Sequence, residues 1–147
     1  MTDPAAGHEL VLDLPVSPGA IDEVQDALAR FWELDGAVTM LDRIRFESAL
    51  VEIVGNAVEH AYAFDSTSGG VGRALEVRLL LDAARVEAEV SDNGLPVEID
   101  LGQVTMPGED AESGRGLALA LAAVDDMRYE RSGGRNRWVL VCRRDQA

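Results

Sequence analysis

A long amphipathic segment in the middle of the chain restricts the fold more than any other stretch of the sequence. From about Leu41 to Ala63 the residues follow the helical period, and residues 52–62 read Glu-Ile-Val-Gly-Asn-Ala-Val-Glu-His-Ala-Tyr. One side of this helix would be apolar: Phe46, Leu50, Ile53, Val54, Ala57, Val58 and Ala61. A helix with such a side has to cover a core, so the segment predicts a helix packed on other elements.

The other side of the same helix carries polar groups. Glu52, Asn56 and Glu59 fall within about 60° of one another around the helix axis. A carboxylate can act as a general base, and an amide oxygen is a suitable ligand for Mg²⁺. The same stripe would also suit the solvated face of an ordinary amphipathic helix. The helix alone leaves both interpretations open.

Composition predicts one globular domain over residues 1–147. Hydrophobic residues make up 47% of the chain, and a chain of 147 residues can form a core unaided. No apolar run is long enough to span a membrane, and the first residues lack the pattern of a secretory signal. Cys142 is the only cysteine, which agrees with a reducing compartment. We expect a cytoplasmic protein in which residues 1–7 form a disordered tail.

The charge of the chain restricts its partners. Asp and Glu number 27 against 13 Lys and Arg, which gives a formal charge of −14. Such a surface repels nucleic-acid phosphates and anionic membranes, so we expect neither as a direct partner. A basic or mixed-charge protein surface is a more suitable large partner. A bound nucleotide would need a local site that outweighs this field.

The remaining patterns predict a sheet covered by helices. Strands are expected at residues 8–14, 74–81, 85–91, 126–131 and 137–143, and a helix is expected from Leu117 to about Val124. Ser17 and Pro18 should cap and begin a further helix, which Asp35-Gly36 ends. Short turns between neighbouring strands favour a mostly antiparallel sheet, and helices on one face give a two-layer α/β sandwich. Residues 97–113 are irregular and acidic, as in a lid, a binding loop or a disordered segment.

Three short motifs follow one another along the chain. The first is the helix with Glu52 and Asn56, the second is Asp92-x-Gly94 at a strand end, and the third is Gly114-Arg115-Gly116-Leu117 at a helix start. Glycines at a helix N-terminus let backbone N–H groups approach a phosphate. A buried Asp at a strand end could accept a hydrogen bond from an adenine amino group. Either glycine motif alone is more commonly a turn, so their combination is what matters.

Together these residues resemble the Bergerat-fold ATP-binding superfamily, which includes gyrase, heat-shock chaperone ATPases, histidine kinases and mismatch-repair proteins. The motifs are Glu52-x-x-x-Asn56-x-x-x-His60-Ala61-Tyr62, Asp92-Asn93-Gly94-x-Pro96 and Glu112-Ser113-Gly114-Arg115-Gly116-Leu117. Within the superfamily, the chain is most similar to the small anti-sigma factor serine/threonine kinases, and this likeness covers nearly its whole length.

The resemblance implies a role for each matching residue. Asn56 would ligate Mg²⁺ between the phosphates of ATP, and Glu52 would be the base that accepts the proton of an incoming hydroxyl. Asp92 would bind the adenine amino group, with Gly94 leaving room for the ring. The lid, residues 97–113, would end in a phosphate-binding group made of Gly114, Arg115, Gly116 and Leu117. Many superfamily members place a Thr before the final strand, and here Asn136 is the candidate to replace it.

The implied function is that of an ATP-dependent anti-sigma factor kinase. Such a protein would bind a sigma factor, phosphorylate a serine or threonine of a STAS-type anti-anti-sigma protein, and form a homodimer. A non-catalytic nucleotide-binding anti-sigma or adaptor module remains the alternative, although Glu52 favours the enzyme. A detached histidine-kinase catalytic domain is less favoured, because no dimerisation helix with a phospho-acceptor His precedes the Glu52 motif and His8 lies in a predicted strand.

Overall fold

The computed structural model describes residues 7–65, 74–94 and 115–144, without the side chains of residues 60–65 and 115. Within these ranges the strands and helices follow one another in the predicted order. The elements are β1 (His8–Pro15), α1 (Ala20–Trp32), α2 (Met40–Asp65), β2 (Ala74–Leu81), β3 (Arg85–Asp92), α3 (Arg115–Ala123), β4 (Asp126–Ser132) and β5 (Arg135–Arg143).

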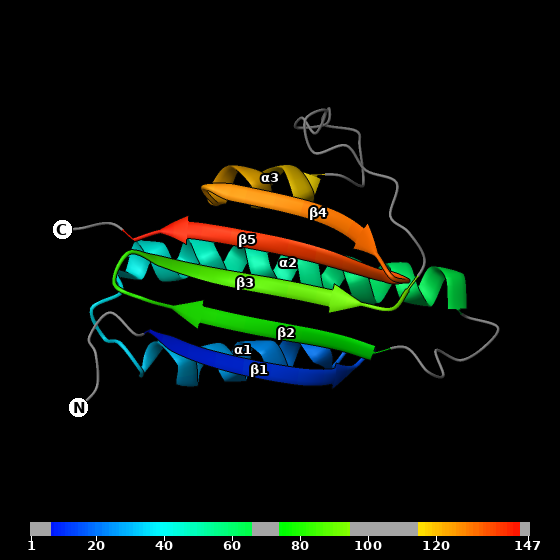
Figure 1. The fold of residues 1–147 in the computed structure, drawn as a ribbon, viewed down its shortest axis with the longest axis horizontal. Helices are drawn as coiled ribbons and strands as arrows, with labels where there is room; N and C mark the ends of the chain where they lie inside the picture. The colour runs from blue at the N-terminus through cyan, green and yellow to red at the C-terminus, as the bar shows by residue number, and fades with distance from the viewer. Residues whose placement is uncertain (1–6, 66–73, 95–114, 145–147) are drawn as a thin grey trace.

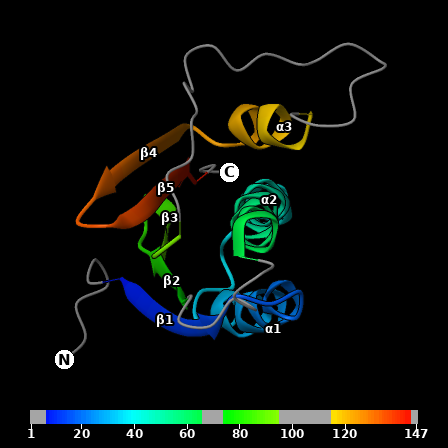
Figure 2. The ribbon, with the colours of Figure 1, turned by 90° about the vertical axis from the view of Figure 1, so that its right-hand side faces the viewer.

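The strands form one five-stranded sheet in the order β1-β2-β3-β5-β4. Every neighbouring pair is antiparallel. The helices α1, α2 and α3 all lie on one side of this sheet, as the end-on view shows (Figures 1 and 2). This arrangement confirms the predicted two-layer sandwich. The pairing of β3 with β5 makes β4 an edge strand and brings the end of β3 beside the start of β5.

The core lies between the sheet and the helices and follows directly from the sequence pattern. In β2 and β3, alternate residues face the helices and are buried, whereas the residues between them are more exposed to solvent. From the helical side, Phe31 of α1 and Phe46 and Ile53 of α2 are fully buried. Burying side chains of this size contributes about 1.5–3 kcal/mol each. The apolar side of α2 therefore fixes the rotation of that helix about its axis.

The start of α1 differs from the sequence-based expectation. The predicted Ser17 cap is wrong, because α1 begins at Ala20 with Gly19 at the cap position and no side-chain cap. Ser17 instead accepts a hydrogen bond from the Ala20 N–H through its carbonyl oxygen (3.0 Å), so Ser17 and Pro18 form a turn before the helix. The helix begins where Ala20, which is fully buried, first meets the core.

The last hairpin is longer than predicted. Its turn contains only Gly133 and Gly134, with φ values of 59° and 77°, and Ser132 pairs with Arg135. Two consecutive residues with positive φ make the tight turn that fits the twist of paired strands. The strand β5 therefore begins at Arg135 instead of Arg137. This extension brings Asn136 into the sheet.

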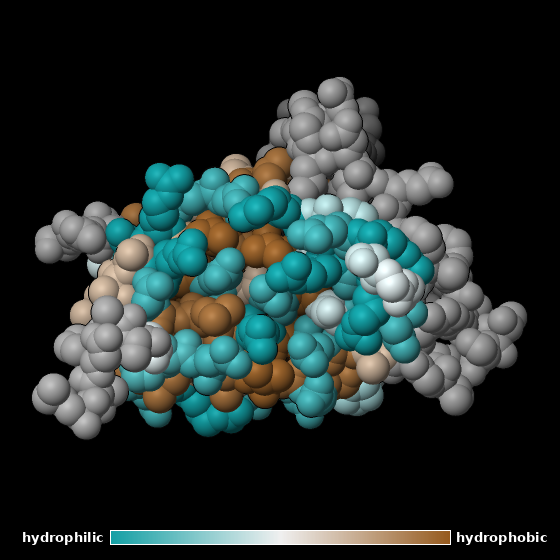
Figure 3. All heavy atoms as spheres, viewed as in Figure 1, coloured by the Kyte–Doolittle hydropathy of each residue, from teal (hydrophilic) through white to brown (hydrophobic). Residues whose placement is uncertain are grey.

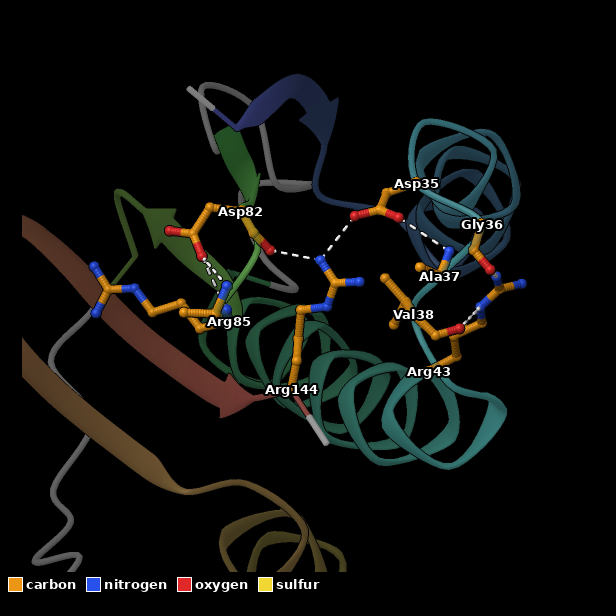
Figure 4. A network of polar contacts seen from close by, with 9 residues as sticks. Asp35, Gly36, Ala37, Val38, Arg43, Asp82, Arg85 and Arg144 are labelled. Atoms are coloured by element: carbon orange, nitrogen blue, oxygen red, sulfur yellow. Dashed lines mark hydrogen bonds and ion pairs between the residues drawn. The ribbon is translucent and has the colours of Figure 1, made fainter. Parts of the chain in front are cut away.

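One end of the sandwich is held together by Arg144, whose side chain is only 8% exposed (Figure 4). Arg144 donates to the Asp35 carboxylate and to the Asp82 carbonyl oxygen, both at 2.7 Å. Asp35 precedes α2 and also accepts a hydrogen bond from the Ala37 N–H (2.9 Å). The hydrogen bond from Arg144 is the main cause of a lowered pKa of Asp35. Arg144 thus ties the α1–α2 connection to the β2–β3 turn.

The outer face of the sheet is turned to solvent. Figure 3 shows mostly hydrophilic side chains on this face, with hydrophobic groups between them. Cross-strand ion pairs include Arg137 with Glu89 at 2.6 Å and Arg78 with Glu9 at 3.6 Å. In the described part of the chain, no helix is both long and apolar enough to cross a membrane.

Candidate functional site

The polar face of α2 opens into a pocket of about 470 Å³ beside the start of α1. Its lining residues are Pro18, Ile21, Glu52, Gly55, Asn56, Val58 and Glu59. Glu52 and Asn56 are half-buried, whereas Glu59 is exposed. The structure therefore brings the predicted base Glu52, the predicted Mg²⁺ ligand Asn56 and the third polar residue of that face, Glu59, to one pocket.

The first turn of α3 reaches the same carboxylate from the other side. Gly116 lies so close to Glu52 that a Cβ atom added to Gly116 would overlap the Glu52 carboxylate. Leu117, the next residue, packs against the core. Of the other predicted phosphate-binding residues, Arg115 begins α3 but its side chain is not among those described, and Gly114 and the lid residues 97–113 lie outside the described residues.

Asp92 ends β3 as a buried carboxylate, with 7% of its surface exposed. Its Oδ1 accepts two hydrogen bonds, from the Gly94 N–H at 2.8 Å and from Asn136 Nδ2 at 2.9 Å. None of the residues that the structure describes donates to Oδ2. A Cβ atom on Gly94 would lie only 2.8 Å from Asp92 Oδ1, so this close approach requires glycine.

Asn136 is fully buried and takes the place that the sequence suggested. Its Oδ1 accepts hydrogen bonds from the Tyr129 hydroxyl (2.5 Å) and from Arg131 Nη1 (3.1 Å). The same Arg131 nitrogen also donates to the Gly94 carbonyl oxygen at 2.6 Å. Sequence reasoning did not identify Tyr129 and Arg131 as parts of this site. A two-residue turn at Gly133-Gly134 was the signal that would have paired Arg131 with Asn136.

These groups gather at one end of the sandwich. The C-terminal end of β3, the start of β5 and the second half of α2 all lie toward the same end in Figure 1. The Arg144 network lies at the opposite end, where β3 begins and β5 finishes. The candidate site is thus a region with a buried carboxylate at the sheet end and a carboxylate–amide pair on the neighbouring helix.

The side chains at this end suit a nucleotide with a magnesium ion. An ionised carboxylate only accepts hydrogen bonds, so Asp92 Oδ2 could receive an amino group of a base. Asn56 can offer one oxygen to a hard cation, and Mg²⁺ characteristically combines few protein ligands with phosphate oxygens and waters. Among the described residues, no group of three or more His, Cys, Asp or Glu side chains could hold a metal ion alone.

Comparisons with known proteins agree with this arrangement. The family model for the histidine kinase-like ATPase domain matches residues 14–142. A search of curated proteins finds no significant match.

Two solved structures share the fold. The first contains the RsbU and RsbW domains of Rv1364c from Mycobacterium tuberculosis, with 26% identity, a TM-score of 0.66, and coverage of 95% of this chain and 33% of that chain. The present chain thus spans about a third of that protein chain. The second is the SiaB–SiaC complex from Pseudomonas aeruginosa, with 13% identity, a TM-score of 0.57, and coverage of 91% of this chain and 89% of that chain. At 13% identity, this second likeness concerns the fold alone.

Proposed function

We propose, because the chain belongs to the family of histidine kinase-like ATPase domains, that it binds ATP between Asp92 and the polar face of α2. The buried Asp92 carboxylate is the observation that carries this proposal. Two donors hold its Oδ1, and Oδ2 is left to accept a hydrogen bond from the adenine amino group. Gly94 places no side chain beside this carboxylate, and so would leave room for the base.

The phosphates would then lie toward α2 and the first turn of α3. Backbone N–H groups at a helix N-terminus attract phosphate oxygens, and Gly116 lets the backbone come close. Asn56 would hold Mg²⁺ together with the phosphate oxygens, and the bound ion would supply positive charge that offsets the phosphates and the acidic chain. By resemblance to the family motif, Gly114, Arg115 and Leu117 complete this phosphate-binding group.

Glu52 would supply the base for phosphoryl transfer to a protein hydroxyl. As the hydroxyl oxygen of a serine or threonine bonds to the γ-phosphorus, its proton passes to the Glu52 carboxylate and ADP leaves with the bridging oxygen. The location of Glu52 in an open pocket beside Asn56 supports this role. Catalysis would otherwise rest on positioning and charge, for which the rigid helix α2 is a suitable support.

The proposed cellular role is that of an anti-sigma factor with serine/threonine kinase activity. The support for it is the motif resemblance and the 26% identity to a structure that includes an RsbW domain. In this role the chain would bind a sigma factor, phosphorylate a STAS-domain anti-anti-sigma protein and form a homodimer.

A second candidate is a nucleotide-binding anti-sigma or adaptor module that transfers no phosphate. One observation favours it, because Gly116 covers the Glu52 carboxylate on the α3 side. If this contact keeps a hydroxyl from reaching Glu52, the protein would bind ATP and a partner without carrying out transfer.

Calorimetry with ATP tests the shared premise of both candidates. Titration of the full chain with ATP and Mg²⁺ should give saturable binding, and removal of Mg²⁺ with EDTA should weaken it. Absence of binding at millimolar ATP would overturn the proposed function. Incubation with labelled ATP and a STAS-domain protein encoded beside this chain then separates the kinase, which labels the partner, from the adaptor, which does not.

A further inference from the structure

We infer that Tyr129 and Arg131 act through Asn136 as positioning residues that make the site selective for a purine with an amino group at position 6. This inference rests on the proposed function, because it concerns the base-binding end of the same site. It adds to the base-binding site two residues of the edge strand β4 that the sequence motifs do not contain.

The residues form a row across three strands. In the sheet register Asp92 of β3 lies opposite Asn136 of β5, and Asn136 lies opposite Arg131 of β4. Tyr129 lies two residues before Arg131 on β4, opposite Trp138 of β5. The Tyr129 ring packs on Trp138 with a centroid distance of 4.8 Å. Hydrogen bonds connect the whole row, from Tyr129 and Arg131 to Asn136 and from Asn136 to Asp92.

This row determines which way the Asn136 amide points. A side-chain amide has an accepting oxygen on one side and a donating nitrogen on the other. Because the Tyr129 hydroxyl and the Arg131 guanidinium both donate, the amide oxygen has to face them, and the nitrogen faces Asp92. The reversed amide would set an oxygen against the Asp92 carboxylate. Tyr129 and Arg131 therefore maintain the hydrogen bond from Asn136 to Asp92 Oδ1.

A fixed Asp92 carboxylate discriminates between bases. With Oδ1 held by Asn136 and Gly94, Oδ2 is an acceptor at a defined position. Adenine presents an amino donor there, whereas guanine would present its carbonyl oxygen and leave two acceptors opposed. Sites that hydrogen-bond a particular group reject analogues that lack it, because their buried polar atoms are then left unpaired. Arg131 also donates to the Gly94 carbonyl oxygen (2.6 Å), and so holds the residue whose N–H donates to Asp92 Oδ1.

The test compares ATP with purine riboside triphosphate, which lacks the 6-amino group, and with GTP. Affinities are measured by calorimetry for the wild type, Tyr129→Phe, Arg131→Met and the double variant. Arg128→Met is the control, because Arg128 lies on the same strand with an exposed side chain that pairs with Asp126. The double variant should lose ATP affinity roughly tenfold, which corresponds to about 1.4 kcal/mol, while affinity for purine riboside triphosphate should change less than about twofold.

The outcomes separate the inference from the proposed function. If the wild type binds no ATP, the proposed function fails, and the inference fails with it. If the wild type prefers ATP and the double variant loses affinity for all three nucleotides equally, or keeps its preference, the inference alone is overturned. Should the double variant not fold, Tyr129→Phe retains the ring on Trp138 and gives the same comparison with a smaller expected loss.

Discussion

Gly116 rests directly on the carboxylate of Glu52, so that even a methyl group at position 116 would collide with it. The other end of α3 is also tied to α2, because Arg45 donates to the Ala123 carbonyl oxygen at 2.9 Å. The helix α3 therefore contacts α2 at both ends. Any shift of the α3 N-terminus would change the space around the proposed base.

Replacing Gly116 by alanine should impair phosphotransfer more than folding. The added methyl group would displace the end of a flexible side chain, and a misplaced catalytic group can cost about 10²-fold in rate. Stability should change by less than about 1 kcal/mol, because alanine also favours the helix. Gly36→Ala is the control, since a Cβ there meets no atom within 4 Å. Equal activity of Gly116→Ala and wild type would show that Glu52 can move without consequence.

Replacing Asp92 by asparagine should weaken ATP binding and relax the preference for adenine. Since both donors hold Oδ1, the new amide would keep its oxygen there and place its NH₂ at the Oδ2 position. A donor would then face the adenine amino group, at a cost of about 1–3 kcal/mol, whereas the guanine oxygen would be matched. Calorimetry should show that Asp92→Asn binds ATP more weakly and GTP more strongly than the wild type. The control Asp126→Asn should have the wild-type affinity for both nucleotides. Unaltered ATP affinity would remove Asp92 from the site.

Replacing Arg144 by glutamine should lower the free energy of unfolding at neutral pH by about 1–2 kcal/mol, because charge-assisted hydrogen bonds are lost. The pKa of Asp35 is lowered in the fold, chiefly by its hydrogen bond from Arg144. Ionised Asp35 therefore stabilises the fold above its unfolded pKa of about 4, and this contribution is lost as the pH falls through the lowered folded pKa.

Urea unfolding at pH 7 and below pH 4 measures this effect. The difference between wild type and Arg144→Gln should shrink in acid without vanishing, because the Asp82 carbonyl oxygen still accepts at low pH. Arg128→Gln is the matched control, since that side chain is 65% exposed and an exposed ion pair contributes at most about 1 kcal/mol. A constant difference at both pH values would exclude the Asp35 carboxylate as the cause.

Cys142 should resist thiol reagents while the protein is folded. The side chain is fully buried on β5, and burial raises the pKa of its thiol to about 11. Because the thiolate is the reactive form, alkylation at pH 8 should be slow for the native protein and fast in denaturant. Reaction at equal rates in both states would show that β5 opens readily.

Local patterns in the sequence were sufficient to predict α2, the central hairpin and the two-layer arrangement, because periodicity directly reflects burial. The pairing of β3 with β5 depends on contacts between strands that are distant in sequence, which a local pattern does not contain. Tyr129 and Arg131 were missed because the predicted turn of the last hairpin was too wide to pair Arg131 with Asn136. The further link from Asn136 to Asp92 follows only from the β3–β5 register. The Ser17 cap was wrong because a backbone turn competed with the side-chain cap.

Phosphotransfer by a Glu52→Gln variant tests the central claim most directly. Wild type, Glu52→Gln and the control Glu47→Gln, from the same helix but outside the pocket, are incubated with labelled ATP and candidate STAS-domain proteins. Glutamine preserves size and helix propensity, so ATP binding should persist while transfer falls roughly 10²–10⁴-fold, the contribution of a positioned base. Undiminished transfer would contradict the role of Glu52, and equal inactivity of wild type and variant with a partner that binds would contradict kinase activity.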